Sequence, residues 1–205
     1  MTDRVVEAVD VCGNEGSIPR TPARYSPERA ARLVTVNQAL WAELKACAAT
    51  MRETLSADSY FGRWRTRVRM LEVLLESLTP EFESFLKYRS TLSDRDDDES
   101  YKVIQSIEET VDHLLERIDG DRDDNEEYLV NFMDEDFETG IGVGFMAALE
   151  RFKDAYQDWD LAWSMMDNID AAPITDDPLA EQNAFDKHLG QLTTGLAKRA
   201  KQAGV

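Results

Sequence analysis

Apolar residues recur every three or four positions along most of this chain, which is the pattern of helices that bury one face. The first such series begins just after Ser26 and Pro27. Serine suits the N-cap of a helix, and proline suits its first helical position. We therefore predict a long helix from this point. Its expected buried positions are Leu33, Val36, Leu40, Leu44, Cys47, Met51 and Leu55.

The same spacing predicts further helices after this one. One is expected from about residue 58 to Leu78, because the residue before Pro80 disfavours helical geometry. The segment Gly140–Gly144 is expected to interrupt the helical pattern, as a hinge or a close helix crossing. The other apolar stripes lie near residues 82–86, 104–118, 128–133, 149–166 and 185–196.

No segment shows the sustained alternation of apolar and polar residues that is typical of strands. The fold class is therefore all-α, a helical bundle of five to seven helices. Residues 1–25 contain two glycines and two prolines and are expected to form a flexible N-terminal tail. Residues 26–205 are expected to form a single helical-bundle domain.

Charge divides this domain into two parts. Residues 26–93 are near neutral, whereas residues 94–186 hold 29 of the 41 acidic residues and six basic ones, a net charge of −23. The whole chain carries −18. This balance opposes direct binding of nucleic acid and of an anionic membrane surface, both of which attract clustered Lys and Arg. A basic protein partner or self-association fits it better.

The N-terminal residues lack the apolar core of a signal peptide, and no run of 18 apolar residues occurs. The two cysteines, Cys12 and Cys47, have no CxxC spacing, so no disulfide framework is expected. These features predict a cytoplasmic protein. No cofactor motif, catalytic triad or zinc signature is found, so we predict no cofactor, no catalytic residues and no metal ligands.

Two charged groups are candidate partner-binding surfaces. Four arginines on one predicted helix, with 63/67 and 65/69 as same-face pairs, form a basic surface that could meet the acidic half of this bundle or of a neighbouring subunit. They are Arg63, Arg65, Arg67 and Arg69. The predicted acidic surface comprises Asp119, Asp121, Asp123, Asp124, Glu126 and Glu127.

Carboxylates of residues 109–138 admit another reading. The pairs Glu109/Asp112, Glu116/Asp119 and Glu135/Glu138 have the i, i+3 spacing used to hold magnesium on facing helices. In a segment so rich in acids, chance also produces this spacing. Residues 119–130 match a calcium loop only in part, because the glycine at position six and the bidentate acid at position twelve are missing.

The sequence therefore favours a non-enzymatic protein–protein interaction module with an assembly, adaptor or regulatory role, in keeping with a viral or mobile-element protein. One alternative is a DNA-mimicking inhibitor of a nucleic-acid-binding protein. The other is a divalent-metal-dependent hydrolase that uses the carboxylates of residues 109–138. The acidity is also in keeping with a high-salt habitat, although residues 26–93 do not share it.

Overall fold

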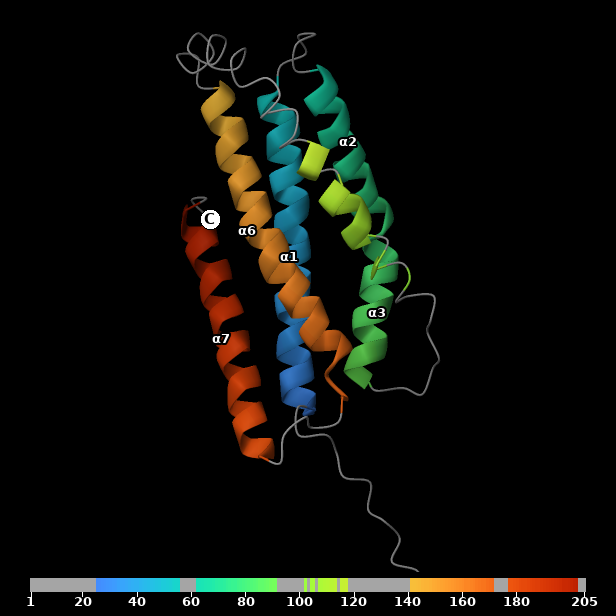
Figure 1. The fold of residues 1–205 in the computed structure, drawn as a ribbon, viewed down its shortest axis with the longest axis vertical. Coiled ribbons are helices and arrows are strands. Elements are labelled where there is room, and N and C mark those ends of the chain that lie inside the picture. The colour runs from blue at the N-terminus through green and yellow to red at the C-terminus, as the bar shows by residue number, and fades with distance from the viewer. Residues whose placement is uncertain are drawn as a thin grey trace, which may run out of the picture.

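The computed structural model describes residues 25–55, 62–91, 141–171 and 177–202 and most positions from 102 to 117. Within these ranges the regular elements are helices, which confirms the all-α bundle. Figure 1 shows α1 at the centre of an elongated bundle, with the other helices packed along it. The predicted tail, residues 1–25, lies outside the described residues except for Tyr25, and the expected helix at 128–133 lies outside them as well.

Helix α1 spans Pro27–Thr54 and starts where the sequence predicts. The hydroxyl of Ser26 accepts a hydrogen bond from the backbone N–H of Arg29 at 3.1 Å, as an N-cap does. All seven predicted apolar positions between Leu33 and Leu55 are buried. This helix is therefore the element around which the core is built.

Helices α2 (Gly62–Ser77) and α3 (Thr79–Thr91) run almost end to end, separated by Leu78. The predicted break ahead of Pro80 is thus confirmed, but it is one residue long. The backbone N–H of Phe82 reaches the carbonyl of Leu78 at 3.0 Å, so hydrogen bonding resumes at once. The hydroxyl of Thr79 accepts a hydrogen bond from the indole Nε1 of Trp41, which holds the junction against α1.

Helix α6 spans Ile141–Asp167, so the prediction that the Gly140–Gly144 segment interrupts the helical pattern is wrong from Ile141 onward, while Gly140 lies outside the described residues. Gly142 and Gly144 fall in the first turn of the helix. A Cβ built on Gly144 would lie 3.1 Å from Cγ2 of Thr54 at the end of α1. The alternative of a close helix crossing is therefore the one that fits, because a glycine lets α6 approach α1 there.

Helix α7 spans Pro178–Gln202 and packs against α6 and α1. The ribbon colours of Figure 1 show that α1 and α7 run in one direction while α2, α3 and α6 run in the other. The helical stretch within 102–117 lies in front of α1 and α2 in this view. Its apolar residues Ile104, Ile107 and Val111 are buried, as the periodicity predicts.

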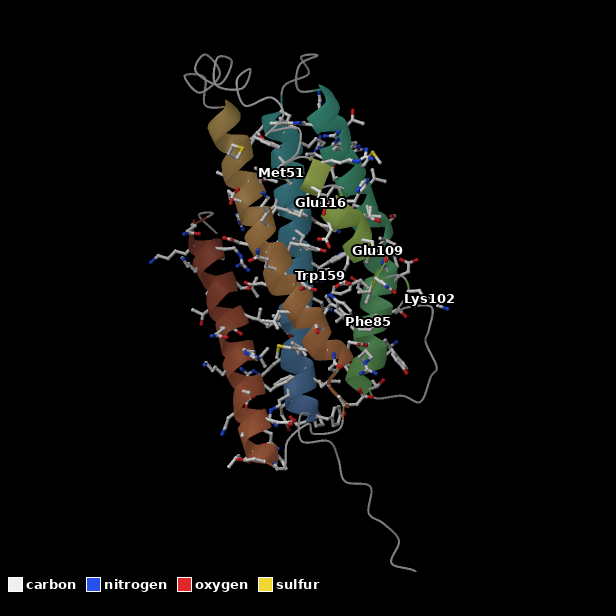
Figure 2. The ribbon with its side chains drawn as sticks, viewed as in Figure 1. Met51, Phe85, Lys102, Glu109, Glu116 and Trp159 are labelled. Atoms are coloured by element: carbon white, nitrogen blue, oxygen red, sulfur yellow. The ribbon has the colours of Figure 1, made fainter. Side chains whose placement is uncertain are left out.

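Aromatic side chains fill the middle of the bundle. The ring of Trp41 lies 4.6 Å from that of Phe82 and 5.5 Å from that of Trp159, centroid to centroid. These rings come from α1, α3 and α6, so they join three helices in one core. Trp159, labelled in Figure 2, is fully buried. None of the helices in the described part of the chain is both long and apolar enough to cross a membrane.

Candidate functional site

The outward face of α2 carries large apolar side chains that the bundle does not cover. Met70 is 57% exposed and Val73 is 53% exposed. They stand three residues apart and therefore share one side of the helix, opposite the buried Val68, Leu71 and Leu75. Single exposed apolar residues are normal on a protein surface, but two neighbours on one helix face can mark a contact site.

Arginines border these apolar residues on the side where α2 meets α1. Met70, Val73, Arg52, Arg65 and Arg69 line one open groove of about 860 Å³. Arg52 comes from the last turn of α1, so the groove extends beyond α2. We call this surface, lined by Arg52, Arg65, Arg69, Met70 and Val73, the α2 groove.

Glu72 fixes two of the groove arginines. Its carboxylate accepts from Nε of Arg52 at 3.2 Å and from Nη1 of Arg69 at 2.7 Å, through different oxygens. One carboxylate thus faces two guanidinium groups, and the side chain of Arg69 remains 61% exposed. Arg52 also pairs with Glu53 at 3.7 Å, and Arg65 adds a third cation, so three guanidinium groups against two carboxylates leave an excess of one positive charge. The arrangement can attract a carboxylate-bearing surface and bury apolar area beneath it.

The four predicted arginines do not form a single surface. Arg65 and Arg69 both line the α2 groove, as the 65/69 pairing predicts. Arg67 faces the other flank of α2, where its Nη1 donates to the backbone carbonyl of Arg117 at 2.9 Å. The side chain of Arg63 lies outside the described residues. The helical period separates residues two apart in this way.

The predicted acidic surface, from Asp119 to Glu127, also lies outside the described residues. Other acids of the same half are described. Glu109, Asp112 and Glu116 are exposed on the helical stretch beside α2, as their positions outside the apolar stripe predict. Figure 2 shows Glu109 and Glu116 on this stretch. Among the described residues, no three His, Cys, Asp or Glu side chains gather as a metal site would require.

A buried network of charges joins α1, α6 and α7, and the sequence did not reveal it. Glu43 accepts from Arg151 at 2.8 Å and from Arg199 at 3.0 Å, through different carboxylate oxygens. Arg199 also donates to Asp158 at 2.7 Å. Burial opposes the charge of Arg199, but the bonds to Asp158 and Glu43 outweigh it and raise the pKa of the guanidinium. Two cations and two anions make this network neutral, which suits a structural role.

A small cavity of about 450 Å³ lies near this network and is lined by residues of α1, α6 and α7. Its wall includes Cys47, which is a free, buried thiol. Burial raises the pKa of Cys47 to about 11. Because the thiolate is the reactive form, this cysteine is unreactive near neutral pH and acts as a small apolar residue of the core.

A cluster of acids lies where the helical stretch of residues 104–117 packs on α6. Oε1 of Glu108 is buried, with Asp160 and Trp163 beside the carboxyl group. Burial is the largest cause that raises the pKa of Glu108 to about 7, and the neighbouring Asp160 adds to the rise. Tyr156 donates from its hydroxyl to the backbone carbonyl of Glu108 at 3.4 Å. Burial also raises the pKa of Tyr156.

No protein-family model, curated protein or solved structure matches this chain.

Proposed function

We propose that this protein is a non-enzymatic helical module that acts through protein–protein contact, with the α2 groove as its contact surface. The observation that supports this proposal is the exposure of Met70 and Val73 beside the arginines of the groove. Burying this apolar pair would contribute roughly 25 cal/mol per Å² of apolar area removed from water. The arginines would steer an acidic partner onto it.

The charge of the groove defines the class of partner. Arg52, Arg65 and Arg69 offer guanidinium groups, which pair with carboxylates through two hydrogen bonds at once. An apolar residue in the partner would have to lie next to its acids in order to reach Met70 or Val73. We therefore propose an acidic, amphipathic protein surface as the partner. The basic partner that we predict for residues 119–127 remains a separate hypothesis.

A comparative pull-down from the native host tests the role of the groove. The bait is the full chain, compared with a Met70→Ser/Val73→Ser variant and with a Leu179→Ser control. Leu179 is 65% exposed at the start of α7, so its replacement removes apolar surface away from the groove. We expect proteins that bind the parent and the control but not the groove variant. Equal recovery with all three baits would contradict the proposal.

A further inference from the structure

We infer that the α2 groove receives the acid-rich half of a second copy of this chain, which makes the protein a homo-oligomer. This inference rests on the proposed function, since it names the partner of the same groove. Three features of the surface support it: the location of the complementary charge, the position of the acids beside α2, and the order of the surface strips.

The complementary charge is present on this chain itself. Residues 94–186 carry −23, while the groove presents Arg52, Arg65 and Arg69. Two copies can therefore offer each other both halves of the contact. A field of this size speeds the encounter of opposite surfaces and makes their association sensitive to salt.

Exposed acids of this half lie directly beside α2. The bond from Arg67 to the carbonyl of Arg117 places the end of the helical stretch within 102–117, next to Glu116, at the flank of α2 away from Arg69. Glu109 and Glu116 of this stretch are exposed (Figure 2). The acids on this neighbouring surface are thus in place to face a partner.

Apart from Arg67, which is bonded to the carbonyl of Arg117, these elements give the surface an order from basic to apolar to acidic. The arginines stand where α2 meets α1, Met70 and Val73 stand on the crest of α2, and Glu109 and Glu116 stand on the next helical stretch. A twofold rotation about an axis through the crest exchanges the two outer strips. It places the acids of one copy against the arginines of the other, twice, and the apolar crest against itself. This is the self-complementarity that a twofold interface requires.

Charge reversal with complementation tests the inference. Sedimentation velocity is measured on the parent, on Arg65→Glu/Arg69→Glu and on Glu109→Lys/Glu116→Lys, at about 0.1 M salt, where the Debye length is roughly 10 Å. We expect the parent to self-associate, and each variant to do so at least about tenfold more weakly, as expected for a loss of about 1.4 kcal/mol. An equimolar mixture of the two variants should form a mixed complex. The reversed groove of one variant then meets the reversed acids of the other, and the unchanged groove meets the unchanged acids.

Matched controls separate the contact from net charge. Lys187→Glu/Lys198→Glu changes the net charge by the same amount as the arginine variant, at exposed positions of α7. Glu28→Lys/Glu83→Lys does the same for the acidic variant, at exposed positions of α1 and α3 outside the acid-rich half. Both controls should associate like the parent. Recovery in the mixture also shows that each variant is folded.

Two results would overturn the inference. One is a parent that stays monomeric up to about 100 µM, well above the micromolar range of ordinary protein contacts. The other is a mixture that associates no better than its separate components. Neither result bears on the pull-down, in which a different protein can still bind through Met70 and Val73. A groove variant that recovers the same proteins as the parent would instead contradict the proposed function, and this inference with it.

Discussion

The carboxylate of Glu43 accepts hydrogen bonds from Arg151 of α6 and Arg199 of α7, and little of it is exposed. Replacing Glu43 with Ala would leave Arg199 buried and paired with Asp158. Removal of one member of a buried ion pair costs about 3–5 kcal/mol. We expect a loss of this order in the free energy of unfolding, measured by urea denaturation.

The control for this change is Glu76→Ala. Glu76 pairs with Lys45 at 2.9 Å, but its side chain is 61% exposed. An exposed pair contributes about 1 kcal/mol or less. Equal losses for the two variants would show that the Glu43 network is no stronger than a surface ion pair.

The raised pKa of Glu108 predicts that the stability of the fold depends on pH. Its pKa of about 7 in the folded protein lies above the value of about 4.3 expected for an unfolded chain. The folded state therefore holds this proton more tightly. The stability that the proton contributes is fully present below about pH 4 and is lost as the pH rises through 7.

The comparison of the parent with Glu108→Gln isolates this effect from the general charge repulsion. As the pH falls from 8 to 5.5, the melting temperature of the parent should rise relative to that of the variant. Glu109→Gln, at the exposed neighbouring position, should follow the parent at both pH values. A constant difference between the parent and Glu108→Gln would mean that Glu108 titrates in the ordinary range.

The same substitution by alanine is expected to change stability differently at two glycines of α7. A Cβ on Gly190 meets nothing within 4 Å, whereas one on Gly195 would lie 2.8 Å from Oδ2 of Asp158. Alanine is about 0.8–1 kcal/mol more favourable than glycine inside a helix. Gly190→Ala should therefore raise the free energy of unfolding by about that amount.

Gly195→Ala should gain less than this or lose stability. The new methyl group would displace Asp158 from Arg199, which weakens an ion pair of a buried guanidinium. Thermal unfolding of the two variants ranks them. If Gly195→Ala proved at least as stable as Gly190→Ala, the close approach of Asp158 to α7 would be ruled out.

The helices themselves could be predicted because burial of an apolar stripe is a local and periodic requirement. The N-cap at Ser26, the stripe of α1 and the break near Thr79 all follow from residues close in sequence. The start of α6 could not be predicted in this way. Its glycines suggest an interruption, whereas Gly142 and Gly144 lie inside the helix and Gly144 meets Thr54 of a helix distant in sequence.

The site depends even more on contacts between distant residues. The sequence did predict that the arginines of α2 divide by helical period, so Arg65 and Arg69 share a face. It did not show that Met70 and Val73 lie on an uncovered face, because this depends on which flank the other helices occupy. The buried bond from Asn37 to the carbonyl of Ala162, 125 residues away, was hidden for the same reason.

At the scale of the whole molecule, the net charge of −18 predicts that salt stabilises the fold. Like charges at i, i+4, such as Glu150 and Asp154 on α6, each oppose a helix by roughly 0.2–0.5 kcal/mol, and ions screen them. The melting temperature should therefore rise between about 20 mM and about 1 M potassium chloride. Calorimetry at a fixed, low protein concentration measures this, and a falling melting temperature would contradict it.

We propose the α2 groove as the surface through which this protein contacts another protein chain. Photo-crosslinking tests it most directly, with benzoylphenylalanine placed at Met70 in one preparation and at Leu179 in another, both in the full chain within the native host. Both positions are more than half exposed, so both probes can reach a neighbour. We expect a discrete adduct, larger than the single chain, from position 70 and none from position 179. The same outcome at both positions, whether adduct or none, would contradict it.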